Sequence, residues 1–459
     1  MRAPTRSRLA GPVRFVLDRL FPRGALLLSV LTFASYGMGL VRDRIFARTY
    51  GAGSELDAYN AAFVLPELTL DVLVASGLAA PFIPILARLT RESADIADQF
   101  ARSVTTLVVL VMGAAAVVLF ITAPRTVDLI APGFDSVERA LYTDLFRVMA
   151  ITPVIFAGSI ALGEVLVASH RFLFYGLAPV LYNVGIVVGT VWLADRLGIF
   201  AAAVGAVLGA ALHLGIRIAG IARTSFRYRP AFAVRTPAFG EFVRLMVPKM
   251  LSHPVEPLTF LFFTAVASGL ADGSVSAVSF ARNFQSVPVS LIGVSFSLAV
   301  FPNLSAAYAA GDRALFVATL RRNVVTIGGL AVLAALALFA VSGIVIEVLL
   351  GGGAFDADDV ARTSLVLAAF AISVPFDALS HPLARAMYAT HNTLLQVIAS
   401  LASLGTIVAL ANVLLAPAGI LAIPLAFAAG SAVKVALLGL FLVPRIRRIS
   451  PETAAALPG

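Results

Sequence analysis

Long apolar runs with almost no charge are the feature that most constrains how this chain can fold. Residues 104–123, 180–194, 324–341 and 420–443 form such runs, each close to the length of a bilayer span. About 20 mostly apolar residues let a helix cross the hydrocarbon core of a membrane, which is about 30 Å thick. The runs are continuous and do not alternate, so they predict helices and not the strands of a membrane barrel.

The composition points the same way. Only 13% of the 459 residues are charged, whereas a soluble domain has about 25%. The absence of cysteine excludes a disulfide scaffold and thiolate metal sites. The net charge of +9 is read as a signal of membrane topology, so no nucleic-acid partner is predicted.

We therefore predict an all-α polytopic membrane protein with twelve transmembrane helices. The second, fourth, seventh and tenth are long and contain proline or polar residues, so we expect them to be tilted or kinked. The predicted spans are 25–46, 57–87, 101–123, 139–168, 173–195, 198–222, 239–270, 274–300, 315–343, 359–388, 393–414 and 418–443.

The predicted orientation follows from arginine in the short loops. Arginines are frequent in 2–23, 223–235 and 445–448, whereas the loops on the opposite side hold few and 356–359 is acidic. Positive loops stay in the cytoplasm, so both termini of this inner-membrane protein are predicted to be cytoplasmic.

The chain also repeats itself at a nearly constant offset. Ala131-Pro-Gly-Phe-Asp135 matches Gly353-Ala-Phe-Asp356, and Ala168-Ser-His170 matches Ala389-Thr-His391. Two parallel repeats of six spans around a central cavity are predicted, with the substrate path between the halves. The predicted parts are a basic N-terminal segment (1–24), an N-lobe (25–222), a linker (223–238), a C-lobe (239–443) and a tail (444–459).

Charged side chains at membrane depth are functional candidates, because each costs about 2.5–3.5 kcal/mol on insertion scales. Arg42, beside Asp43, and Arg282 lie in apolar surroundings, and a guanidinium suits bidentate contact with phosphate. An interfacial arginine that snorkels is the alternative for Arg42. Asp377 in span ten is a further candidate for a cavity or coupling role.

Span two carries three acidic residues. Asp57 stands at its start and fits an N-cap equally well. Glu67 and Asp71 are four residues apart on one helix face, where like charges repel. A wet cavity or a bound cation would make this pair tolerable, and structural salt bridges are the alternative.

Span seven has three prolines in the ten residues from Pro248 to Pro257. These prolines break the helical hydrogen bonds and predict a hinge at which Lys249, His253 and Glu256 face a cavity. A kink with satisfied polar groups is the alternative. The sequence has no nucleotide-binding glycine loop, metal-ligand spacing or nucleophile elbow, so neither an enzyme nor a cofactor is predicted.

The sequence resembles one family over most of its length, most strongly in residues 35–90 and 275–310. Gly39-Leu-Val-Arg42-Asp43, Leu56-Asp57-Ala-Tyr59 and Phe280-Ala-Arg282-Asn283 are similar, in order and spacing, to the MurJ/MviN lipid II flippases. The resemblance implies transfer of an undecaprenyl-pyrophosphate-linked peptidoglycan precursor to the outer leaflet by alternating access. It also implies the fold of the multidrug/oligosaccharidyl-lipid/polysaccharide exporter superfamily.

Residue by residue, Arg42, Asp57 and Arg282 match positions that this family uses for its substrate. Two departures are Ser35-Tyr36 and Leu70-Asp71, where the family has arginines, and Lys249 is a candidate replacement. The family typically has fourteen spans, against the twelve predicted here. The resemblance implies a lipid-linked substrate and membrane lipids as partners, with a coupling ion or membrane potential of unspecified identity.

Three other functions are compatible with these features. A related polyprenyl-linked polysaccharide exporter would share the lipid anchor. A cation-coupled drug antiporter would use the acidic residues of span two. A membrane scaffold that has lost transport would tolerate the absent arginines, and it would also tolerate alanine at Arg42 and Arg282.

Overall fold

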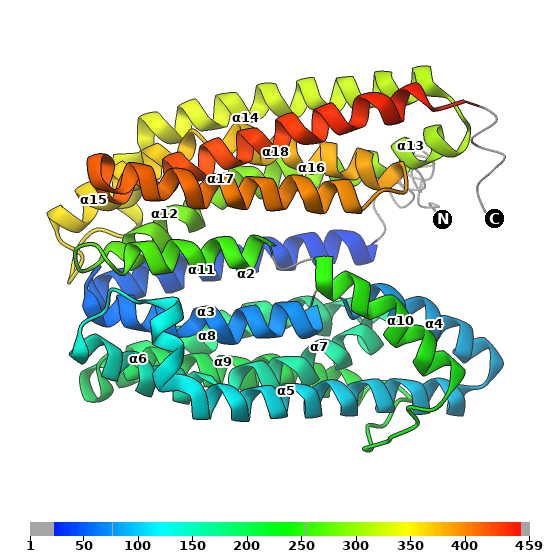
Figure 1. The fold of residues 1–459 in the computed structure, drawn as a ribbon. Coiled ribbons are helices and arrows are strands. Elements are labelled where there is room, and N and C mark those ends of the chain that lie inside the picture. The colour runs from blue at the N-terminus through cyan, green and yellow to red at the C-terminus, as the bar shows by residue number, and fades with distance from the viewer. Residues whose placement is uncertain (1–22, 76, 253–254, 451–459) are drawn as a thin grey trace, which may run out of the picture. The chain divides into compact units, whose positions relative to one another are not determined.

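The computed structural model describes residues 23–75, 77–252 and 255–450, which are almost entirely helical (Figure 1). The first helices are α2 (Arg23–Tyr50), α3 (Ser54–Leu70), α4 (Ala79–Glu92), α5 (Ala94–Ile130), α6 (Ser136–Met149), α7 (Thr152–Ala168), α8 (Phe172–Leu197) and α9 (Phe200–Ile221). They are followed by α10 (Pro237–Ser252), α11 (Val255–Ala267), α12 (Ser274–Pro288), α13 (Ser295–Ala309), α14 (Arg313–Leu349), α15 (Ala357–Ala371), α16 (Val374–Ala389), α17 (Leu394–Ala418) and α18 (Ala422–Arg447). Three short segments interrupt them, namely the π-helical η1 (Asp71–Ala75) and η2 (Val289–Val294) and the 3-10 turn η3 (Gly419–Leu421).

Within the described chain, eight helical segments are long and apolar enough to cross a membrane, or nine if the bent pair α15–α16 is one span. Their outward side chains are large and apolar, with Trp192 76%, Val413 70% and Ile121 69% exposed. Surfaces of soluble monomers rarely carry large contiguous apolar patches, and lipid is the solvent that suits such side chains. The predicted all-α, multi-pass membrane fold is therefore confirmed.

Three of the four spans predicted to be tilted or kinked are broken in the structure, and residues 253–254 of the hinge predicted in the seventh lie outside the described residues. The second span passes from α3 into η1 after Pro66, and the fourth is divided just before Pro153. The tenth is divided just before Pro375, where α15 and α16 meet at 43°. Proline lacks an N–H and clashes with the preceding turn, which accounts for the breaks before Pro153 and Pro375. The π-helical η2 in the eighth span, directly after Pro288, was not predicted.

The backbone shows the internal repeat at the ends of helices. His170 and His391, which follow α7 and α16, have left-handed φ values of 55° and 53°. Gly198 and Gly419, which follow α8 and α17, have φ values of 54° and 55°. A left-handed residue after the last turn is a common helix ending, and histidine adopts it more readily than most residues. Both pairs have the 221-residue offset found in the sequence.

Contacts divide the described chain into two compact units. Unit 1 consists of 23–45, 69–121 and 147–251, and unit 2 of 46–68, 122–146 and 252–450. Two segments of the N-terminal half thus pack within unit 2. Hydrogen bonds hold them there, from the Ala354 N–H to the Arg48 carbonyl (2.9 Å) and from the Gly133 N–H to Ser268 Oγ (3.2 Å). The division into lobes at 25–222 and 239–443 stays a prediction.

The predicted linker lies within unit 1 and is irregular until α10 begins. It is anchored along α5. The Ala231 N–H donates to Thr106 Oγ1 (3.2 Å), and the Ala233 N–H donates to Ser103 Oγ (3.0 Å). The segment is therefore fixed against a helix of its own unit and is not a free tether.

Small residues bring α8 and α9 into close contact in unit 1. A Cβ added to Gly185 would lie 2.3 Å from the Gly209 Cα, and one added to Gly189 would lie 2.4 Å from the Gly205 Cα. Helices in lipid lack a hydrophobic drive to associate, so close approach at small residues stabilises their packing. Both helices carry the glycines four residues apart, which places them on one face.

This contact predicts the effect of a larger side chain. A Cβ at Gly209 would lie 2.3 Å from the Tyr182 carbonyl oxygen, so Gly209→Leu should destabilise unit 1 by about 1–3 kcal/mol through overpacking. The measurement is the thermal unfolding midpoint of the purified protein in detergent. Gly215→Leu is the matched control on the same helix, because no atom lies within 4 Å of its added Cβ. Equal midpoints for the two variants would contradict the prediction.

Candidate substrate-binding site

Arg42 lies near the end of α2 and is held by two side chains of unit 1. Its Nε and Nη2 donate to Asp43 Oδ1 at 3.0 and 2.7 Å, and its Nη1 donates to Asn183 Oδ1 of α8 at 3.3 Å. The Arg42 side chain is 26% exposed and that of Asp43 7%. The guanidinium is thus oriented by oxygens inside the unit, which does not fit the snorkelling alternative.

Asp57 lies in the first turn of α3 and is almost fully buried in unit 2. Its carboxylate accepts hydrogen bonds from the N–H groups of Gly273 (2.8 Å), Val275 (3.3 Å) and Ser276 (2.7 Å), and from Ser276 Oγ (2.6 Å). These donors form the N-terminus of α12, where a negative charge is stabilised by unpaired N–H groups and the helix dipole.

The alternative assignment of Asp57 as the N-cap of its own helix is wrong, because α3 begins at Ser54 and the carboxylate caps α12. Both carboxylate oxygens already have donors, so the geometry favours a contact between helices over direct binding of substrate.

Arg282 is held in unit 2 by groups from three helices, α11, α18 and its own helix α12. Its guanidinium carbon lies 5.0 Å from the ring centre of Phe260 (α11) and 5.2 Å from that of Phe427 (α18). Its Nη1 donates to Gln285 Oε1, and Nη2 lies 4.0 Å from Glu256 Oε1. The side chain is 13% exposed, and among the described residues its Nε has no hydrogen-bond partner. A planar cation with one unused donor suits contact with an oxyanion.

Gln285 connects this arginine to the bend between α15 and α16. It is fully buried, and its Nε2 donates to Ser373 Oγ at 3.1 Å and to Asp377 Oδ2 at 3.3 Å. The structure therefore brings Arg282, Glu256 and Asp377 together within unit 2. The sequence analysis did not identify Gln285 as a site residue. The available indication was its position three residues after Arg282, about one helical turn away.

Glu256, although 72% exposed, belongs to the group around Arg282. Of the other candidates, Lys249 is exposed on α10 of unit 1. Glu67 is exposed near the end of α3, and Asp71 begins η1. His253 lies outside the described residues. Arg42 belongs to unit 1 and Arg282 to unit 2.

A buried polar cluster in unit 1 was missed by the sequence analysis. Arg217 of α9 donates through Nη1 to the Ser159 carbonyl (2.6 Å) and lies 4.9 Å from the Tyr175 ring centre. His213 Nδ1 is 2.7 Å from Ser159 Oγ. Arg217 and His213 both lie inside the apolar run of α9. An arginine within an apolar run was the sequence feature that could have indicated this cluster. The contacts of Arg217 are internal to the helix bundle, so we interpret it as structural.

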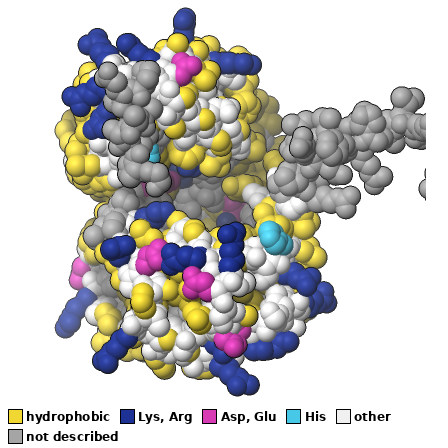
Figure 2. Space-filling model, turned by 90° about the vertical axis from the view of Figure 1, so that its right-hand side faces the viewer, with side chains coloured by type: hydrophobic (Ala, Val, Ile, Leu, Met, Phe, Trp, Pro, Cys, Tyr) yellow, Lys and Arg dark blue, Asp and Glu magenta, His cyan; other side chains and the backbone are white. Residues whose placement is uncertain are grey.

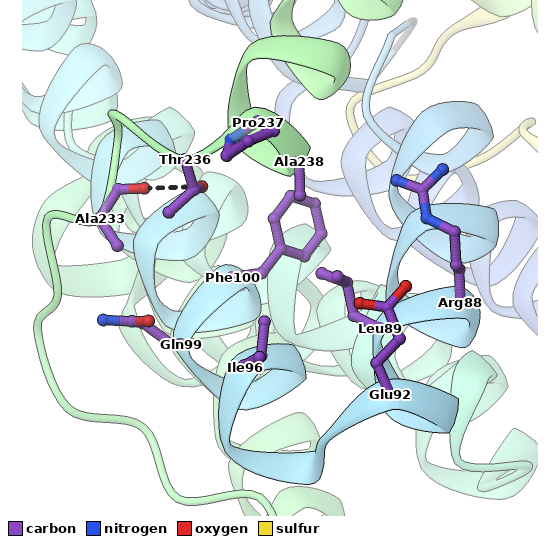
Figure 3. Close-up of a pocket in the computed structure, with 10 residues that line it drawn as sticks. All are labelled: Arg88, Leu89, Glu92, Ile96, Gln99, Phe100, Ala233, Thr236, Pro237 and Ala238. Carbon is purple, nitrogen blue, oxygen red and sulfur yellow. Dashed lines mark hydrogen bonds between the residues drawn. The ribbon is translucent and has the colours of Figure 1, made fainter.

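A cavity of about 400 Å³ opens elsewhere in unit 1 (Figure 3). It lies between the end of α4, the start of α5 and the start of α10, with the Phe100 ring at its centre and Glu92 and Arg88 at one side. None of the residues that line it was predicted to be functional. Within the described chain, no group of three or more histidine, cysteine or acidic residues could hold a metal ion.

Comparisons with known proteins agree with this geometry. A family model described as lipid II flippase MurJ matches residues 46–456. A probable lipid II flippase MurJ of Thermotoga maritima is 30% identical over 368 residues, covering 80% of this chain and 73% of the relative. The lipid II flippase MurJ of Burkholderia cenocepacia is 27% identical over 376 residues, covering 80% and 73%.

Two solved structures share the fold. A lipid II flippase MurJ in an inward closed conformation matches with a TM-score of 0.79 and 23% identity, over 94% of this chain and 91% of that one. An inward-facing multidrug resistance transporter of the MATE family, in the MOP superfamily, matches with a TM-score of 0.72 and 15% identity, over 95% and 100%. The family model spans most of the sequence, so the chain is a membrane transport protein and belongs to the lipid II flippase MurJ family.

Proposed function

We propose that this chain moves lipid II from the inner to the outer leaflet of the bacterial inner membrane by alternating access, in the service of peptidoglycan synthesis. Arg42 and Arg282 bind the diphosphate of the lipid. The observation that carries this assignment is Arg282, a largely buried cation between two aromatic rings with an unused Nε donor. Family membership supports the same substrate.

The physical reason lies in the charge of the diphosphate. An anion cannot enter hydrocarbon without a compensating charge, because its desolvation costs many kcal/mol. A guanidinium offers two parallel donors to phosphate oxygens, and burial strengthens the attraction. Asp43 and Asn183 hold Arg42 in place, as Gln285 holds Arg282. Lys249 stays a proposed substrate-binding residue. The proposed cavity or coupling residues are Asp43, Glu67, Asp71, His253, Glu256 and Asp377.

The first functional prediction concerns the two arginines. Arg42→Ala and Arg282→Ala should each abolish rescue of a cell depleted of its own flippase, while expression stays normal. Arg282→Lys should rescue only partly, because an ammonium lacks the planar fork and stacks less well. Arg322→Ala, which removes an exposed arginine of α14, is the control and should rescue fully. Full rescue by Arg42→Ala or Arg282→Ala would refute the assignment and favour a scaffold.

Twelve crossings are part of this proposal. The stretch 394–447 is one of the eight apolar segments named above. Within it, α17 and α18 pack against each other on either side of η3, so they form two antiparallel crossings. The helix α2, with 28 residues, supplies one further crossing. The successive helices α10 and α11 are counted together as another. Together with the seven other apolar segments and the bent pair α15–α16, the total is twelve.

Both termini are proposed to be cytoplasmic. Figure 2 views the face at which α4 ends and α10 begins, and lysine and arginine side chains are spread over it. Arg88, Arg235 and Arg313 belong to the segments predicted to be inside. Basic residues are retained on the cytoplasmic side during insertion, which supports this orientation.

The chain contains no cysteine, so single cysteines can report the orientation. Ser225→Cys, in an exposed position of the linker, should react with a membrane-impermeant maleimide only after the cells are permeabilised. Asp195→Cys, exposed near the end of α8, should react in intact cells. The opposite labelling pattern would reverse the proposed topology.

Alternating access requires contacts that open and close, and unit 2 offers a defined one. The start of α3 is bound to the start of α12 by Asp57, and beside it Asn60 Nδ2 donates to Ser276 Oγ at 3.2 Å. We propose that these two helix starts separate once in each transport cycle. The four hydrogen bonds of the Asp57 carboxylate favour the joined state.

A cysteine pair tests this proposal directly. The Asn60→Cys/Ser276→Cys double variant should form a disulfide under oxidation and stop lipid II flipping, since the two helix starts can then no longer separate. A reductant should restore activity, and each single variant should be insensitive to oxidant. Leaflet accessibility of lipid II is the measurement. Normal flipping by the fully cross-linked protein would show that this contact does not open.

A further inference from the structure

A polar stripe runs along α16 in unit 2, beyond the residues assigned above. Asp377, His381 and Arg385 are spaced four residues apart, so they lie on one face of the helix. At about 1.5 Å per residue the stripe is about 12 Å long. Its first member, Asp377, touches Gln285 and so lies beside the Arg282 site. The stripe continues from that site toward the end of α16.

Lys434 lies on α18, which packs against α16. It is close to the middle of a 26-residue apolar helix, far from either end. The charges of Asp377, Lys434, Glu256 and Arg385 all act on His381, which places these groups around it. The Arg385 guanidinium lies 5.6 Å from the ring centre of Phe301 on α13. Lys434 and Arg385 are both half-buried.

These two cations lack an acidic partner in the part of the chain that the structure describes. No carboxylate oxygen lies within 4.0 Å of either Lys434 or Arg385, and neither side chain donates a hydrogen bond there. Asp377, the acidic residue of the stripe, is already bonded to Gln285. A charge at membrane depth is costly unless it is paired, so two neighbouring unpaired cations call for an anion from outside the chain.

We propose that Arg385 and Lys434, with His381 between them and the Arg282 site, form a second binding station for the diphosphate of the substrate. This inference rests on the proposed function. In it, the diphosphate passes between Arg282 and the second station, about 12 Å apart along α16, and meets a cation at both. With two stations, the diphosphate crosses the membrane in shorter steps. It meets a compensating cation at Arg282 and again at Arg385 and Lys434.

Binding of undecaprenyl diphosphate tests the second station. The probe is added to the full chain in nanodiscs of phosphatidylcholine, and its affinity is measured by native mass spectrometry or fluorescence titration. Lys434→Gln and Arg385→Gln should each weaken binding about tenfold, the effect of losing one charge-assisted hydrogen bond. Lys434→Arg should retain affinity because it keeps the charge. Arg447→Gln, at the exposed end of α18, is the control and should bind normally.

The melting temperature gives a second readout, because a substrate-binding lysine and a structural lysine predict opposite changes when the charge is removed. Because an unpaired charge destabilises the empty protein, Lys434→Gln should leave the melting temperature unchanged or raise it. The increase in melting temperature on adding undecaprenyl diphosphate should shrink in the same variant. A lower melting temperature of the empty variant would indicate a structural lysine and would overturn the proposal.

The remaining outcomes separate this inference from the proposed function. Normal affinity in both glutamine variants, with loss in Arg282→Ala, would reject the second station and leave the first. Normal affinity in all three variants would reject both. If phosphatidylglycerol competes as well as undecaprenyl diphosphate, the site is one for ordinary lipid headgroups, and the inference fails as well.

Discussion

Charge held at membrane depth is the constraint on which the rest of this structure depends. A guanidinium or carboxylate in an apolar bundle is stable only where protein groups replace its water. Each functional candidate meets this condition differently. Arg282 is held between two rings and a glutamine, Arg42 by Asp43 and Asn183, and Asp57 by the N-terminus of α12. The Nε of Arg282 has no hydrogen-bond partner among the described residues, so it remains available to the proposed substrate anion.

The breaks in the helices supply some of the polar groups that replace water around these charges. The bend between α15 and α16 leaves Ser373 outside both helices, and its Oγ accepts from Gln285 Nε2 at 3.1 Å. Gln285 in turn orients Arg282. Directly after Pro288 the same span changes to the π-helical η2, a form that occurs frequently at functional sites. The break before Pro375 thus places the hydroxyl of Ser373 beside Gln285 at membrane depth.

The sequence predicted features that depend on neighbouring residues, but it did not predict contacts between residues that are far apart in the chain. Apolar runs, proline breaks and the offset between His170 and His391 depend on neighbouring residues, and the structure contains all three. Asn183, which binds Arg42 from 141 residues away, could not be predicted, because one asparagine in an apolar run carries no sign of its partner. The capping of α12 by Asp57, across 219 residues to Ser276, was unpredictable for the same reason, and the local alternative was wrong. Such contacts are set by the packing of helices, which periodicity does not encode.

The placement of Asp57 links opening of the protein to its binding chemistry. The carboxylate fixes the first turn of α12, and Arg282 follows Ser276 by six residues on that same helix. A helix moves largely as a rigid body, so the proposed release of its N-terminus would also shift Arg282 relative to the rings of Phe260 and Phe427 on other helices. The affinity for diphosphate would then differ between the joined and separated states of this contact. Such a difference is what a transporter needs in order to bind on one side and release on the other.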